Sequence, residues 1–415
     1  MTQNDPEDRQ MPTQPGSLDR AADIDLLLGD AGVQTALQHL QLDDEQTLLE
    51  QVAIARIPAP TGDEGLRARF MQQAMADAGL TVEAIDAVGN VAAHYPGSPS
   101  SGAPTVISAH LDTVFDAATP IEIVHDGAQL TGPGVSDDAR GLAALLALAR
   151  ALRAGGVSFE HPLWFAATVG EEGAGDLRGV RHLFSAEGHF GEGCRGFISL
   201  DGAGMGGVVT RGVGSLRYRI ALQGPGGHPW ADAATPSPIH ALGCIVGRLS
   251  QLPLPSECTV NAGRWGGGTS VNSIATDAWV EVELRATEPT HLESLNMQLH
   301  DIVRAECAGL SGPGRGPKLV SSLSLLGSRP AGVTPDDSPL VQAALDATSA
   351  LGGRADTGAS STDANGPMAQ GIAAITMGAG GQAGLAHTRS EWYHNSDGHK
   401  GIARALLTLL LFDRS

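Results

Sequence analysis

The chain has 415 residues, more than one hydrophobic core usually organises, so two or three domains are expected. Its composition, 42% hydrophobic and 17% charged, is that of a folded soluble protein rather than a disordered one. The net charge of −20 repels a phosphate backbone and an anionic bilayer alike, which argues against nucleic acid and membrane surfaces as partners.

The cysteines and the N-terminal segment indicate a cellular location. Four cysteines without a C-x-x-C spacing are too sparse for a disulfide framework in so long a chain and are expected to be reduced thiols. No apolar run approaches the roughly 18 to 20 residues of a membrane helix, and no signal-peptide pattern is present. We therefore predict a cytoplasmic protein. Residues 1–20 hold almost no aliphatic side chains and are expected to form a flexible tail.

From residue 21 to residue 210, helical periodicities alternate with short β-branched runs. This alternation predicts a mostly parallel sheet whose strands are joined by helical crossovers. The expected elements are a helix at residues 66–78, a strand at 105–108, a helix at 138–153, and strands at 163–169 and 197–200.

Between residues 211 and 327 the pattern changes to βαββαβ, which is typical of a ferredoxin-like sandwich with helices on one face. The expected elements are strands at 215–222, 258–265, 278–285 and 319–326 and helices at 238–252 and 291–308. Over residues 328–415 the first pattern returns, with a helix at 339–351, a strand at 373–377 and a helix at 402–411. The predicted fold class is therefore α/β, with a smaller βαββαβ domain inserted into the larger one.

Candidate metal ligands follow the carboxyl ends of four predicted strands, and two more acids stand where a helix begins. Because parallel strands present their carboxyl ends at one edge of a sheet, these side chains are expected to converge. The set consists of His110, Asp112, Asp137, Asp138, Glu171, Glu172, Asp201 and His387.

Each piece has a simpler interpretation when it is taken alone. A single His-x-Asp is usually a surface pair, Asp137-Asp138 could cap the following helix, and Glu171-Glu172 could be an exposed acidic turn. The need for a soluble surface does not explain why several apolar strands each end in His, Asp or Glu. The occurrence of all these motifs together therefore favours a metal site. Two histidines with three carboxylates suit two zinc ions that share one carboxylate and activate a water. A free Glu of the adjacent pair could accept its proton, and Asp112 could fix the tautomer of His110.

Five ordered motifs carry these residues: Ser-Ala-His110-Leu-Asp112, Val-Ser-Asp137-Asp138-Ala, Glu171-Glu172-Gly, Leu-Asp201-Gly and His387-Thr-Arg-Ser-Glu391. They resemble the ligand motifs of the dizinc metallopeptidase family that includes peptidase T, carboxypeptidase G, carnosinase, aminoacylase and acetylornithine deacetylase. The resemblance runs from about residue 48 to the end of the sequence and favours the peptidase T-like branch. One departure is Arg140, where many relatives have a lysine.

The resemblance also implies a role for each position. Asp137 would bridge both metals, with His110 and Asp201 completing one site. Glu172 and His387 would complete the other. Glu171 would be the general base.

The segment 211–327 resembles the lid of this family, which commonly dimerises and sends a histidine into the partner's active site. His228, in a Gly-Pro-Gly-Gly-His turn, would then stabilise an oxyanion, although such a histidine can also be merely exposed. Asn272 and Arg285 resemble positions that hold a substrate carboxylate, whereas Arg285 could equally pair with Glu283 or Glu281.

The predicted function is hydrolysis of amide bonds in small peptides, of aminopeptidase, dipeptidase or tripeptidase type, by a metal-bridging hydroxide with Glu171 as general base. An N-acyl or N-carbamoyl amino-acid amidohydrolase or deacetylase is the alternative, and Asp363, expected to be available to an ammonium group, slightly favours peptides. A non-catalytic binding protein is a second alternative, but the complete set of predicted ligands argues against it. The expected cofactors are two Zn²⁺ per subunit, with Co²⁺ or Mn²⁺ also suited, and a homodimer through the inserted domain is expected.

Overall fold

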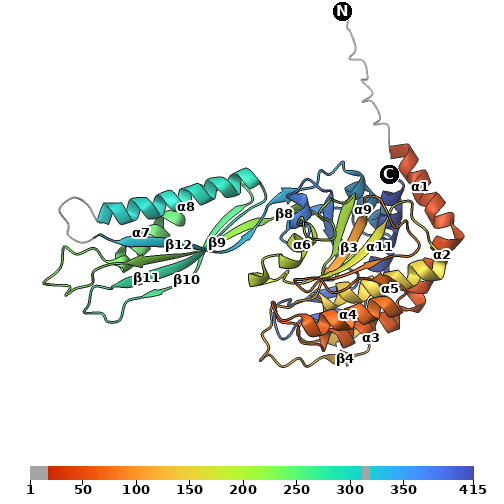
Figure 1. Cartoon of the computed structure of the whole chain (residues 1–415), viewed down its shortest axis with the longest axis horizontal. Coiled ribbons are helices and arrows are strands. Elements are labelled where there is room, and N and C mark those ends of the chain that lie inside the picture. Colours follow the sequence, from red (N-terminus) through yellow and green to blue (C-terminus); the bar gives the residue numbers. More distant parts are fainter. Residues whose placement is uncertain (1–16, 311–317) are drawn as a thin grey trace, which may run out of the picture.

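The computed structural model describes residues 17–310 and 318–415, which build a large α/β unit and an extended antiparallel domain beside it (Figure 1). The strands of the central sheet are β1 (Thr81–Val82), β2 (Val91–His94), β3 (Thr105–His110), β6 (Leu163–Thr168), β7 (Gly196–Leu200), β8 (Val208–Gly212), β13 (Gly332–Val333), β14 (Thr357–Ser360) and β15 (Ala374–Met377). Eight of them follow the order β1-β2-β6-β3-β7-β15-β8-β13, and β14 pairs with β8. The predicted α/β class with a mostly parallel centre is confirmed.

The middle of this sheet is parallel and buried on both faces. β3 pairs in parallel with β6 and β7, and β15 pairs in parallel with β7. Successive side chains enter different cores: Val106 packs in a cluster with α6 (Arg178–Leu183), while Ile107 packs in a cluster with α5 (Ala139–Gly155) and α11 (Gly398–Asp413). Two covered faces explain why these strands are continuous apolar runs.

Helices that the sequence patterns did not predict precede the sheet. They are α1 (Ser17–Gly29), α2 (Ala31–Leu42) and α3 (Asp44–Ala55), followed by the predicted α4 (Gly65–Asp77). α2 and α3 both pack against α5. Of the tail expected at residues 1–20, residues 1–16 lie outside the described residues, and Ser17 begins α1.

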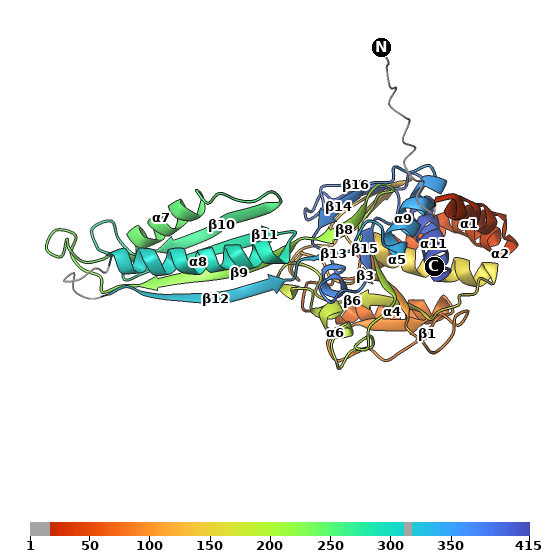
Figure 2. The ribbon, with the colours of Figure 1, turned by 90° about the horizontal axis from the view of Figure 1, so that it is seen from above.

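The inserted domain has the predicted βαββαβ order. Its elements are β9 (Gly214–Gln223), α7 (Pro238–Leu249), β10 (Cys258–Gly267), β11 (Asp277–Ala286), α8 (Pro289–Leu310) and β12 (Val320–Arg329). The sheet order is β10-β11-β9-β12 with every pair antiparallel, and both helices cover one face (Figure 2). At about 3.3 Å per residue, the ten residues of β9 span roughly 30 Å, so the loop after β9 lies far from the loop before it.

A third, small sheet joins distant parts of the chain. It has the order β16 (Gln382–Gly384), β17 (Trp392–His394), β5 (Gln129–Thr131) and β4 (Val124–Asp126). This sheet holds the loop that carries His387 beside the segment that precedes α5. The remaining elements are the short helices η1 (Gly173–Gly175) and α10 (Asn365–Met368) and the predicted α9 (Pro339–Ala350). Within the described ranges, every helix is too short or too polar to cross a bilayer.

Candidate metal centre

Asp137 lies at the centre of a cluster built from four separate segments. Its Oδ1 lies 2.8 Å from His110 Nε2, and its Oδ2 lies 2.9 Å from His387 Nε2. His387 Nε2 is also 3.0 Å from Glu172 Oε1. Ligand atoms of His110, Asp137 and Glu172 all lie within 4.8 Å of one another. The structure thus brings four of the five predicted ligands into direct contact at the carboxyl edge of the sheet.

The ring of His110 is held by the segment that follows it. His110 ends β3 and is buried, and its Nδ1 lies 3.0 Å from the carbonyl oxygen of Asp112 and 3.6 Å from Asp112 Oδ1. With Nδ1 donating to that carbonyl, Nε2 is left to face Asp137. The carboxylate of Asp112 accepts hydrogen bonds from the backbone N–H groups of Glu171 and Glu172, both at 2.9 Å. Asp112 therefore orients the acidic pair as well as His110.

Asp138 and Asp137 have different surroundings although they are adjacent. Asp138 Oδ1 accepts hydrogen bonds from the N–H groups of Gly141 and Gly202, and its Oδ2 accepts one from the N–H of His110. The helix-cap interpretation therefore holds for Asp138, which caps α5, while Asp137 points at the histidines.

The electrostatics of the cluster fit bound cations. Burial, together with nearby carboxylates, raises the pKa of Asp201 to about 7 and the pKa of Glu171 well above its ordinary value. Burial alone would raise the pKa of Asp137, but hydrogen bonds with the two histidines hold it well below its usual range. Hydrogen bonds with Asp137 and Glu172 raise the pKa of His387 to about 10. Buried carboxylates and imidazoles facing one another are the donor set that divalent metal ions take.

A cavity of about 410 Å³ opens on this cluster and contains Glu171 and Asp201 in its wall. Three arginines also line the cavity: Arg217, Arg285 and Arg329. Arg285, predicted for a substrate carboxylate, does line the cavity, and it also pairs with Glu283 at 2.8 Å. Arg217 pairs with the same Glu283 and donates to the carbonyl of Gly173.

Two further residues of the site were not assigned from the sequence. Glu391 is buried, and its carboxylate accepts hydrogen bonds from the N–H groups of Gly134, Ser136 and Asp137. The sequence feature that could have identified Glu391 is its place in the motif that begins with His387. Arg329 is bonded to Glu171, and no local pattern links residues so far apart in the chain.

Three predicted residues lie away from the cluster or are shielded from it. His228 follows β9 and Asn272 lies between β10 and β11, so both sit in exposed loops at the far end of the inserted sheet. His228 Nδ1 accepts hydrogen bonds from the N–H groups of Trp230 and Ala231. The expectation that Asp363 is available to an ammonium group is wrong, because its side chain is 1% exposed and accepts a hydrogen bond from Thr168.

Comparison with known proteins gives consistent matches. The chain matches the model of peptidase family M20/M25/M40 over residues 106–410. It is 24% identical over 288 residues to the uncharacterized protein YqjE of Bacillus subtilis (strain 168), covering 65% of this chain and 74% of YqjE. The aminopeptidase PepT structure from Bacillus cereus superposes with a TM-score of 0.74 at 19% identity, covering 89% of this chain and 99% of that one. An amidase of the hydantoinase/carbamoylase family from Burkholderia vietnamiensis superposes with a TM-score of 0.66 at 18% identity, covering 92% and 98%.

Proposed function

Since this chain belongs to peptidase family M20/M25/M40 and is a metal-dependent hydrolase, we propose that it cleaves the amide bonds of small peptides. The observation that carries the proposal is the contact of His110, His387 and Glu172 around Asp137, beside an arginine-lined cavity. A hydrolase of this kind needs cation ligands, a proton carrier and a substrate anchor in one place, and the cavity wall offers candidates for all three.

The metal ligands follow from the donor set. We assign His110 and Asp201 to one cation, Glu172 and His387 to a second, and Asp137 to both. Nitrogen and carboxylate donors in this combination suit Zn²⁺ first, with Co²⁺ and Mn²⁺ as alternatives. Such cations, when bound, polarise a carbonyl group and lower the pKa of water.

Glu171 is the residue that we assign to proton transfer. It borders the cavity, it neighbours the ligand Glu172, and burial raises its pKa well above its ordinary value, which strengthens it as a proton acceptor. In this role it accepts a proton from water and delivers it to the amine that leaves.

The test is turnover by Glu171→Gln in a metal-replete assay, because glutamine keeps the size of the side chain but cannot accept the proton. We expect a loss of roughly 10²-fold to 10⁴-fold in kcat with unchanged metal content. Glu45→Gln, an exposed position on α3, serves as the control. Near-normal turnover of Glu171→Gln would show that the proton carrier is another group.

The substrate anchor is the arginine group of the cavity, since an arginine fork suits a carboxylate. Both a peptide and an N-acyl or N-carbamoyl amino acid end in a carboxylate, so the arginines and the likeness to an amidase fold keep that second class as a candidate. A panel of free-amine di- and tripeptides against N-acetyl and N-carbamoyl amino acids separates the two. Hydrolysis confined to the blocked amino acids would replace the peptidase proposal with the amidohydrolase one.

His228 and Asn272 belong to the proposal only through a second copy of the chain. Both lie at the distal end of strands that span roughly 30 Å, so they cannot reach the cavity of their own chain in this arrangement. We assign His228 to the oxyanion formed in the partner's site, and Asn272 to the substrate carboxylate there. This assignment requires a homodimer through the inserted domain.

A further inference from the structure

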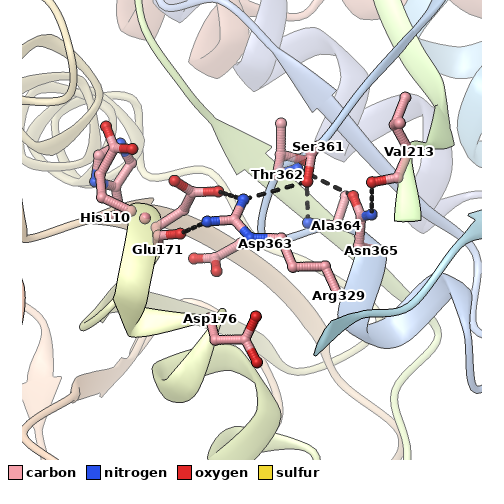
Figure 3. Close-up of polar contacts among 12 residues, drawn as sticks. His110, Glu171, Asp176, Val213, Arg329, Ser361, Thr362, Asp363, Ala364 and Asn365 are labelled. Atoms are coloured by element: carbon pink, nitrogen blue, oxygen red, sulfur yellow. Dashed lines mark hydrogen bonds and ion pairs between the residues drawn. The ribbon is translucent and has the colours of Figure 1, made fainter. Parts of the chain in front are cut away.

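Arg329 holds the side chain and the main chain of Glu171 together. It is the last residue of β12, where the chain returns from the inserted domain to the large unit. Its side chain is 6% exposed, and its Nη1 donates to Glu171 Oε1 at 3.2 Å while its Nη2 donates to the carbonyl oxygen of Glu171 (Figure 3). The same Nη1 lies 3.2 Å from Ser361 Oγ.

Two chain segments, called here the crossings, connect the large unit with the inserted domain: one enters it just before β9, and the other, which carries Arg329, returns from it at the end of β12. The buried side-chain amide of Asn365 holds both. Asn365 Nδ2 donates to the carbonyl of Val213, just before β9, and to the carbonyl of Pro330, just after Arg329. Its Oδ1 accepts a hydrogen bond from the N–H of Thr362 (Figure 3). Because Asn365 is fully buried, water does not compete for these bonds. The outgoing crossing, the return crossing and the loop before α10 are thus tied together.

The other two arginines of the cavity pair with a different carboxylate. Arg217 and Arg285 share the carboxylate of Glu283 and have side chains that are 23% and 35% exposed. Arg329 is more deeply buried and pairs with Glu171. Its geometry therefore suits holding a neighbouring carboxylate in place more than meeting an incoming substrate.

We propose that Arg329 is a positioning residue that sets the orientation of Glu171 from the domain crossing. The N–H of Glu171 is bonded to Asp112, so its main chain is held on both sides, and Arg329 adds the contact that fixes the carboxylate. Without Arg329 the carboxylate is free to rotate in the cavity, and a reacting group displaced by about 1 Å can lose roughly 100-fold in rate. This inference rests on the proposed function, because it concerns the residue assigned there to proton transfer.

The first experiment compares Arg329→Met and Arg329→Lys with the wild type on Ala-Ala-Ala and on N-acetyl-alanine. We expect Arg329→Met to lower kcat by about 100-fold, with KM changed less than about threefold and metal content unchanged. Arg329→Lys should recover part of kcat, because lysine keeps the charge but not the two-pronged contact. Arg211→Met, which removes a partly exposed arginine of β8 that pairs with Glu257, is the matched control and should leave kcat unchanged. A raised KM with kcat retained would overturn the proposal in favour of a substrate anchor.

The second experiment tests whether the two residues act as a unit. In a Glu171→Asp background, the further loss from Arg329→Met should fall below about threefold, and a fully multiplicative loss would contradict the proposal. Hydrogen exchange at the amides of residues 171 and 172 should accelerate in Arg329→Met, and unchanged exchange would also contradict it. If Arg329→Met does not fold, the same measurements are made on Arg329→Lys, where smaller changes in the same direction are expected. If the wild type hydrolyses nothing in the panel, the proposed function has failed, while the exchange experiment still decides whether Arg329 holds Glu171.

Discussion

The edge of the central sheet and the far end of the inserted domain both present a histidine in a loop or strand end, but the two surroundings differ. His110 is 2% exposed and is held by Asp137 at its ring and by Asp138 at its backbone N–H. His228 is exposed, and its ring accepts hydrogen bonds from its own loop. The first histidine is fixed by segments remote in sequence, whereas the second is organised locally.

The sheet edge and the distal loops should therefore contribute to activity in different ways. The sheet edge assembles its cluster within one chain, so changes there should alter metal binding and turnover at any protein concentration. The described loops at the far end of the inserted domain do not contact the cavity of their own chain, so substitutions there should alter turnover only when a second copy of the chain is present. The predictions below test this division.

The largest effect is expected for Asp137→Ala, because Asp137 touches both histidines of the cluster. Its loss should remove both cations and lower turnover by at least about 10³-fold. Elemental analysis and a peptide assay provide the measurements, with Asp126→Ala on the exposed strand β4 as the control. Retention of two ions per chain would show that Asp137 is not the shared ligand.

His228→Ala is expected to lower kcat by about 10²-fold to 10³-fold, the usual consequence of removing one oxyanion donor, with metal content intact. Mixing this variant with Glu171→Gln should restore activity, since a mixed dimer contains one site with both Glu171 and the partner's His228. Sedimentation measures the association. No recovery in mixtures that demonstrably exchange subunits would remove His228 from the mechanism.

Asp112→Asn should have a smaller effect, because it touches the ligands rather than a cation. The amide can accept only part of the hydrogen bonds that the carboxylate accepts from Glu171, Glu172 and Thr61. We expect a loss of roughly 10-fold to 100-fold in metal affinity or turnover, measured by chelator competition and by kcat. Wild-type values in both assays would show that the orientation of the acidic pair does not depend on Asp112.

The smallest effect is expected at Trp230, which is 90% exposed in the distal loop. Trp230→Ser should change the free energy of unfolding by no more than about 0.5 kcal/mol, measured by urea denaturation at a concentration where the chain is monomeric. A substantially larger loss would mean that this loop packs against the chain in solution, and the division between the two regions would weaken.

Much of the architecture was predictable because the periodicity of apolar residues encodes both the element type and its buried face. The strand that ends in His110 and the strand that precedes Asp201 are apolar runs, and the rule that parallel strands share a carboxyl edge predicts that the ligands at their ends meet. The βαββαβ order of the inserted domain was predicted for the same reason. The three-residue strands of the small sheet were not predicted, since they carry too little pattern, and β1, β2, β8, β13 and β14 of the central sheet were not predicted either.

Apolar periodicity thus predicted the mostly parallel sheet, four of its nine strands, the βαββαβ order of the inserted domain and a cluster of side chains of the kinds that bind metal ions. Only the packing of distant elements shows that Arg329 is hydrogen-bonded to Glu171, that Glu391 supports the loop before Asp137, and that the side chain of Asp363 is buried. The first two contacts join residues 158 and 254 positions apart. Local patterns encode which face of an element is buried, but the partner of a buried polar group depends on how distant elements pack around it.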